Sequence, residues 1–190
     1  MRKNRRGDCA VCRSVSRLQA ALSSTRAMHI EAFPNGIAAS TPLNATPYVF
    51  TQAEFLQHFG FSPARQNLLA AFTTTLQLVG DNGAVPLFAI VGGSILDDAR
   101  QDPRDLDVAI FYRASLERPP DAARLQSLCH SVSRERKLDL RLLPFDGPAA
   151  MTAKLIGFFT ILYSQRRSEA GVAPVAIVDL CPSVQRNPTT

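Results

Sequence analysis

Apolar residues recur along this chain with two spacings, one helical and one strand-like. A helix is predicted between Pro63 and Gly80, where apolar side chains lie three or four residues apart (Leu68, Leu69, Phe72, Leu76 and Val79). A shorter helix is predicted up to Phe59, because Thr51 and Glu54 have the spacing of a capping box. A third helix is predicted over residues 119–135, again from the helical period of its apolar positions.

Four apolar runs predict strands, which cover residues 87–93, 105–112, 138–145 and 172–180. The segment between the first two strands is expected to form a short helix or turn. Residues 149–164 begin as a helical pattern, but FFTILYS within them fits a strand equally well, so both remain open. Residues 28–50 show no period and are expected to be irregular. The fold class predicted is α/β, one domain with a small mixed sheet flanked by helices.

The net charge of +5 is concentrated at one end of the chain. Residues 1–27 contain seven Lys or Arg and one Asp, so the remainder is nearly neutral. We therefore expect a basic extension over residues 1–27, a folded domain over 28–182 and a tail over 183–190. A neutral body argues against a surface that grips nucleic acid broadly, although residues 1–27 could form a nucleic-acid-binding arm.

The cysteines and the hydropathy of the chain bear on where the protein is expected to be located and on which partners are expected. Cys9 and Cys12 have metal or redox spacing, but no second pair or nearby His completes a zinc site. No apolar run reaches the roughly 18 residues that a membrane helix needs, so no membrane partner is expected. Nothing requires an oxidising compartment, and a cytoplasmic location is the expectation.

Candidate chemistry gathers around the second predicted strand. Asp105 and Asp107 alternate with Leu106 and Val108, so both carboxylates point to one face, about 7 Å apart along the strand. Asp139 occupies a similar position in the third strand, and it joins the other two if the strands are neighbours. Three carboxylates there can bind two Mg²⁺ ions, with Mn²⁺ as the other ion they would accept. Two ions about 3.5–4 Å apart can promote displacement at phosphorus.

A glycine-rich turn precedes these carboxylates. Gly92 and Gly93 let a phosphate approach the backbone, and the hydroxyl of Ser94 and the N–H groups that follow can donate hydrogen bonds to it. The turn is neither a dinucleotide fingerprint nor a P-loop. The alternative interpretation is that Ser94 only caps a short helix.

Three motifs follow one another: hhGGS, in which h is an apolar residue, then D-x-D on an apolar strand, then a later h-D-h strand. This order resembles the nucleotidyltransferase superfamily of DNA polymerase β, in particular its minimal nucleotidyltransferases. The wider run, from Phe33-Pro34-Asn35-Gly36 to the VAIVDL strand, also resembles an uncharacterised bacterial family described as nucleotidyltransferase-like. The resemblance implies a nucleoside triphosphate (NTP) substrate such as ATP on Gly93 and Ser94. It also implies Mg²⁺ on Asp105 and Asp107.

In the same resemblance Asp139 would activate a hydroxyl acceptor, which would be a protein, an RNA end or a small molecule. Many relatives have an Arg or Lys soon after the Gly-Ser; here Arg100 or Arg104 would have to serve. Few residues follow the fourth strand, so a partner protein, a second copy or residues 28–80 would have to supply the acceptor surface. Two alternatives remain: a catalytically inactive nucleotide-binding module of the same fold, and a nuclease that uses the same carboxylates. Arg141 could also simply neutralise Asp139.

Overall fold

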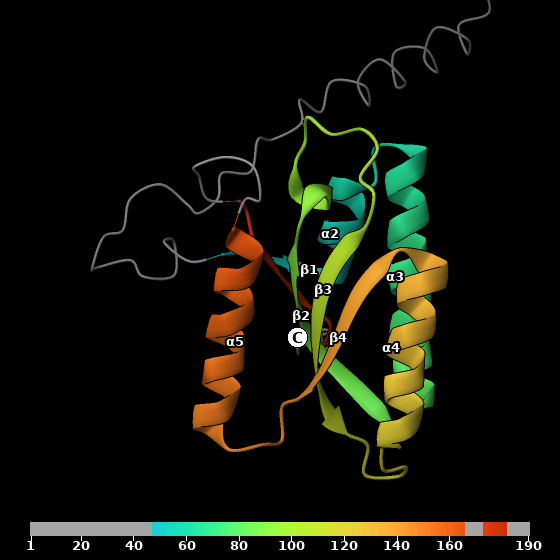
Figure 1. Cartoon of the computed structure of the whole chain (residues 1–190), viewed down its shortest axis with the longest axis vertical. Coiled ribbons are helices and arrows are strands. Elements are labelled where there is room, and N and C mark those ends of the chain that lie inside the picture. The colour runs from blue at the N-terminus through green and yellow to red at the C-terminus, as the bar shows by residue number, and fades with distance from the viewer. Residues whose placement is uncertain (1–46, 166–172, 182–190) are drawn as a thin grey trace, which may run out of the picture.

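In the computed structural model of the protein, residues 47–165 and 173–181 are described, and they form a mixed α/β fold (Figure 1). Five strands make one open sheet: β1 (Tyr48–Thr51), β2 (Ala84–Gly92), β3 (Leu106–Ala114), β4 (Leu138–Pro144) and β5 (Ala176–Asp179). The α-helices in this part of the chain are α2 (Gln52–Phe59), α3 (Pro63–Asp81), α4 (Ala122–Arg136) and α5 (Ala149–Ser164). A short 3₁₀ helix, η2, spans Ser94–Leu96.

The strand order in the sheet is β1-β5-β2-β3-β4. The centre is antiparallel, since β2 pairs antiparallel with both β3 and β5. Both outer pairs, β1 with β5 and β3 with β4, are parallel. The connection from β3 to β4 runs through α4, which is the kind of crossover that a parallel pair requires. Because β3 and β4 are parallel, their first residues lie at the same end of the sheet.

Helices cover both faces of the sheet, but unequally. The larger core lies between the sheet and helices α2, α3 and α4, where alternate strand residues such as Val108 and Leu140 pack with Phe55 and Phe72. The opposite face is packed against α5, where Ala109 and Phe111 lie in the same cluster as Phe159 and Tyr163. Figure 1 shows α5 standing on one side of the sheet, with α3 and α4 on the other.

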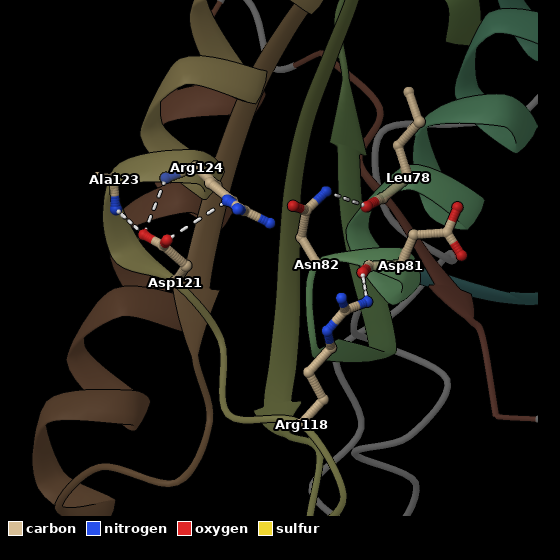
Figure 2. A network of polar contacts seen from close by, with 7 residues as sticks. All are labelled: Leu78, Asp81, Asn82, Arg118, Asp121, Ala123 and Arg124. Atoms are coloured by element: carbon tan, nitrogen blue, oxygen red, sulfur yellow. Dashed lines mark hydrogen bonds and ion pairs between the residues drawn. The ribbon is translucent and has the colours of Figure 1, made fainter.

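The helices begin where their capping residues predict. The Thr51 side chain accepts a hydrogen bond from the Glu54 amide, while the Glu54 carboxylate accepts one from the Thr51 amide. Ser62 caps α3 ahead of Pro63. At the start of α4, Figure 2 shows the Asp121 carboxylate accepting hydrogen bonds from the amides of Ala123 and Arg124. These caps confirm the predicted helix starts near 52 and 63.

Several predicted boundaries were wrong. Residues 48–50, which were expected to belong to an irregular lead-in, are part of strand β1, because this segment pairs in parallel with β5, more than 120 residues later in the chain. Helix α3 continues through Gly80 to Asp81, and β2 already begins at Ala84. The open choice over 149–164 is decided as one helix, α5. Strand β5 is confined to Ala176–Asp179 within the longer run predicted.

Some expectations fall on residues that the structure does not describe. These are the basic extension over 1–27, the tail over 183–190, Cys9 and Cys12, and the Phe33-Pro34-Asn35-Gly36 segment. Among the helices of the described residues, none is both long and apolar enough to cross a membrane.

Candidate functional site

The glycine-rich turn is placed where the sequence predicted, between the end of β2 and η2. Gly93 has φ 81° and ψ −165°, a conformation that favours glycine strongly. A Cβ on Gly92 would lie 2.4 Å from Cβ of Tyr163, and a Cβ on Gly93 would lie 2.4 Å from Oδ2 of Asp107. A side chain at either position would therefore collide with a neighbour, Tyr163 on α5 or Asp107 on β3, so glycine is required at both.

Asp107 and Asp139 are brought together, as the sequence predicted for neighbouring strands. Asp107 on β3 is the register partner of Asp139 on β4, and it also pairs with Gly92 on β2. Their side chains lie on the face that packs against α5, since Ala109 of the same strand face is in the α5 cluster. Neighbouring strands are about 4.8 Å apart, so the two aspartates are adjacent residues on this face.

Asp105 is less closely associated with this pair. It precedes β3 by one residue and is exposed. Within 47–165 and 173–181, no group of three His, Cys, Asp or Glu side chains is close enough to hold a metal ion together. The register of β3 and β4 brings Asp107 and Asp139 together, and a metal-binding role for Asp105 stays a prediction.

Asp139 forms an ion pair with Arg141 on the same strand. The guanidinium Nη1 lies 2.6 Å from Oδ1 of Asp139, and it also donates a hydrogen bond to the carbonyl of Leu140 at 3.1 Å. The side chains are 53% exposed for Arg141 and 44% for Asp139. A cation is therefore already present on the strand face that carries the two carboxylates, as the neutralisation alternative anticipated.

Tyr163, near the end of α5, packs against Gly92 on the buried side of this site. The residue is only 8% exposed, and its hydroxyl is buried with no hydrogen-bond partner. Burial raises the pKa of the phenol strongly, and the negative charges of Asp107 and Asp139 raise it further, whereas Arg141 lowers it. The phenol is thus neutral and close to all three charged groups.

Ser94 supplies a second hydroxyl without a partner. Its Oγ is buried and makes no hydrogen bond, and no hydrogen bond from that side chain caps η2. The expected alternative, in which Ser94 serves as a plain cap, does not describe this geometry. Buried hydroxyls are normally satisfied, so the hydroxyls of Ser94 and Tyr163 depart from the usual pattern.

The loop after the turn is held by Arg65, which sequence analysis did not single out. The Arg65 side chain is fully buried at the start of α3 and stacks on Phe61 with its Cζ 4.2 Å from the ring centre. Its guanidinium donates hydrogen bonds to the carbonyls of Ile95, Asp97 and Arg100. Ser62 adds a hydrogen bond to the Gln101 carbonyl. The start of α3 therefore fixes the backbone that follows Ser94.

Two acidic residues on this loop differ in their surroundings. Asp97 is exposed and accepts a hydrogen bond from the Ala99 amide, whereas both carboxylate oxygens of Asp98 are buried without a hydrogen bond. Burial lowers the pKa of the Arg65 guanidinium, and the charges of Asp98 and Asp97 partly oppose that shift. Asp98 therefore has Arg65 as its electrostatic neighbour.

Arg100 and Arg104, the predicted phosphate-binding cations, are both exposed. The Arg100 backbone carbonyl is bound by Arg65, which fixes its main chain and leaves its side chain in solvent. Their role in nucleotide binding stays a prediction, and Arg141 is a cation that lies next to Asp139.

The residues that sequence analysis missed carried only weak signals. Arg65 looks like an ordinary surface residue in the first turn of a helix, and only the tertiary fold buries it. Tyr163 lies in the FFTILYS segment, whose helix or strand character the period left open. Its proximity to Gly92 depends on how α5 packs over β2, which no local pattern encodes.

Comparison with known proteins gives one match. A family of unknown function (DUF6932) matches residues 29–179. The chain belongs to this family. No curated protein and no solved structure matches the chain. Membership agrees with the expectation of an uncharacterised domain family, and the match includes β1–β5, the turn and both paired aspartates.

Proposed function

We propose that this protein is a Mg²⁺-dependent nucleotidyltransferase with a polymerase-β-like fold, which moves a nucleoside monophosphate from an NTP to a hydroxyl acceptor and releases pyrophosphate. The observation that carries the proposal is the in-register placement of Asp107 and Asp139, with Asp107 against Gly93. A phosphate-binding turn and a pair of carboxylates are needed together for this chemistry, and they adjoin here.

The residues fit a magnesium ion. Mg²⁺ is commonly bound by one or two carboxylates together with substrate phosphates, and Asp107 and Asp139 offer such a pair on one face. Asp105, just before β3, is the proposed additional ligand. When bound, the metal would neutralise charge on the phosphates and lower the pKa of the acceptor hydroxyl. A pair of carboxylates beside a phosphate turn therefore suffices for this proposal.

The turn would hold the phosphates. Gly93 keeps the backbone open to close approach, and the buried Ser94 hydroxyl, which has no partner, can donate to a phosphate oxygen. The Arg65 guanidinium donates hydrogen bonds to the carbonyls of Ile95 and Asp97, just after the turn, and so fixes this backbone. The turn is therefore rigid before the ligand arrives, which lowers the entropic cost of binding.

In the proposed reaction the acceptor oxygen attacks the α-phosphorus as the bond to the β-phosphate oxygen breaks. Pyrophosphate leaves with the electron pair of that bond, and Asp139 takes the proton of the acceptor hydroxyl. The acceptor is a protein side chain, an RNA end or a small molecule. A second copy of the chain or a partner protein is proposed to complete the acceptor surface.

One observation favours a second candidate, a nucleotide-binding module without transfer activity. Arg141 lies 2.6 Å from Asp139 and neutralises the carboxylate that would otherwise accept the proton. A protein in which this ion pair persists would bind the nucleotide through the turn and leave the acceptor unactivated.

The test is transfer of label. Purified full-length protein is incubated with Mg²⁺, each α-³²P-labelled NTP in turn, and cell extract, and labelled protein and RNA are separated by electrophoresis. Asp107→Asn and Asp139→Asn each remove one carboxylate at nearly unchanged size. The matched control is Asp146→Asn, which changes an exposed acid just after β4.

Label on protein or RNA with the wild type and Asp146→Asn, but lost in the other two variants, supports transfer and identifies the acceptor class. Binding of NTP without transfer favours the module instead. Absence of both NTP binding and transfer would contradict the use of Gly93, Ser94 and Asp107 as a nucleotide site.

A further inference from the structure

Asp139 and Arg141 are paired with each other through the same two charges that the proposed substrate complex would need. Arg141 Nη1 lies 2.6 Å from Oδ1 of Asp139. For a substrate complex to bind here, Asp139 would have to exchange Arg141 for a metal ion, and Arg141 would have to exchange Asp139 for a phosphate. Asp139 and Arg141 are two residues apart on β4, so both charges lie on the same face of the sheet as their register partners Asp107 and Ala109 on β3. The Leu140 carbonyl between them also accepts a hydrogen bond from Arg141.

We propose that this pair is an exchange latch: a metal–nucleotide complex opens it, the metal replacing Arg141 at Asp139 while Arg141 binds a phosphate of the nucleotide. This inference rests on the proposed function and extends it by naming Arg141, in place of Arg100 or Arg104, as the phosphate-binding cation. It also requires that metal and nucleotide bind together and that each alone binds weakly.

The surroundings of the pair support a ligand at this point. Tyr163 is more than nine-tenths buried, its hydroxyl has no hydrogen-bond partner, and its side chain packs on Gly92 beside the two aspartates. The Ser94 hydroxyl is likewise buried without a partner. The Tyr163 hydroxyl lies within the influence of Asp107, Asp139 and Arg141, and it would gain an acceptor from an oxygen-rich anion bound at this pair.

The exposure of the pair makes the exchange feasible. Both side chains are about half exposed, at 53% and 44%, so opening the pair leaves no charge stranded in the core. A half-exposed ion pair contributes little to stability, and a divalent metal with a polyphosphate offers stronger charges to each partner. Arg141 reaches phosphate oxygens with a planar fork of donors, which suits this role better than a lysine would.

The exchange makes a reciprocal prediction. Arg141→Met frees Asp139, so the metal alone binds more tightly, while the nucleotide loses a cation and binds less tightly. Asp139→Asn frees Arg141, so the nucleotide alone binds more tightly and the metal less tightly. We expect each gain to be roughly fivefold, the size expected for a half-exposed pair. A merely structural role would change both affinities in the same direction.

The experiment measures the affinity of the full-length protein for Mn²⁺, from its electron paramagnetic resonance signal, with and without α,β-methylene-ATP, which cannot be cleaved at the α,β bridge. Calorimetry gives the affinity for the nucleotide with and without Mn²⁺. Arg124→Gln is the matched control, because Arg124 forms an exposed pair with Asp121 at 3.5 Å on α4 (Figure 2).

Opposite changes in Arg141→Met and Asp139→Asn, with Arg124→Gln unchanged, support the latch. If the wild type binds metal and nucleotide together and Asp139→Asn weakens metal binding, but Arg141→Met changes neither affinity and Asp139→Asn brings no gain for the nucleotide, the latch is wrong and the proposed function stands. If the wild type binds neither ligand, alone or together, both proposals are overturned. Should Arg141→Met fail to fold in a thermal melt, the gain in nucleotide affinity of Asp139→Asn decides alone.

Discussion

Asp107 lies directly over Gly93, so that a Cβ on this glycine would be 2.4 Å from the Asp107 carboxylate oxygen Oδ2. The contact links the last residue of the turn before η2 to the second residue of β3. The turn and the carboxylate are therefore packed directly against each other. Changes at either residue are therefore expected to affect both.

Replacement of Gly93 by alanine is expected to lower the free energy of unfolding by about 1–3 kcal/mol, because φ 81° with ψ −165° is essentially restricted to glycine. The added Cβ also displaces the Asp107 side chain, so binding of metal and nucleotide should be lost. Urea denaturation and calorimetry measure the two effects. Gly80→Ala is the control: it lies in α3 with nothing within 4 Å of its new Cβ and should be stabilising by up to about 1 kcal/mol. Equal effects of both changes would contradict this account.

Replacement of Arg65 by methionine is expected to cost about 3 kcal/mol or more, because buried carbonyls on the loop after Ser94 lose their donors. Hydrogen exchange should increase at the amides of residues 95–101. Arg118→Met provides the matched comparison: that exposed side chain donates a single hydrogen bond of 2.8 Å to the Asp81 carbonyl, as Figure 2 shows. Its loss should cost less than about 1 kcal/mol. A small effect at Arg65 would show that the loop is held by other contacts.

Replacement of Tyr163 by phenylalanine is expected to raise the stability of the ligand-free protein by about 1 kcal/mol, because a buried hydroxyl without a partner is removed. The same change should reduce the stabilisation that Mg²⁺ and nucleotide provide together, because a donor to the ligand is lost. Thermal melts with and without ligand measure both effects. The partly exposed Tyr48 gives the control variant, Tyr48→Phe. A Tyr163→Phe protein that is less stable without ligand would mean that the hydroxyl has a partner after all.

Glu54 provides a test of pH dependence. Hydrogen bonds from the backbone and side chain of Thr51 lower the pKa of the Glu54 carboxyl in the folded protein. A lowered folded-state pKa means that its contribution to stability is present above the unfolded pKa of about 4.3 and is lost as pH falls. The wild type should therefore lose more stability between about pH 6 and about pH 3 than Glu54→Gln, which keeps the capping geometry without the charge.

Urea denaturation at several pH values measures this difference. Glu117→Gln, which makes the same change at another exposed glutamate, is the matched control. Parallel acid profiles for wild type and Glu54→Gln would contradict the prediction.

Local patterns predicted most of the helices and strands. Thr51, Glu54 and Ser62 mark helix starts by their own hydrogen-bonding chemistry, which acts within four residues and is therefore readable in sequence. Strand β1 could not be predicted in this way, because its four residues are a strand only by pairing with β5. Helix α5 was ambiguous, because an apolar segment with little polar contrast fits either period.

The candidate site was likewise predictable only in part. By itself the sequence determined the Gly92-Gly93-Ser94 turn and the alternation that puts Asp107 and Asp139 on one face of their strands, since both follow from glycine's backbone freedom and the two-residue period of a strand. Tertiary structure alone decided that these strands are neighbours in register and that Tyr163 packs on Gly92, whereas the pairing of Arg141 with Asp139 was one of the alternatives that the sequence left open. The strand register and the Tyr163–Gly92 contact join segments tens of residues apart, so their geometry depends on packing of the whole sheet and not on any local preference.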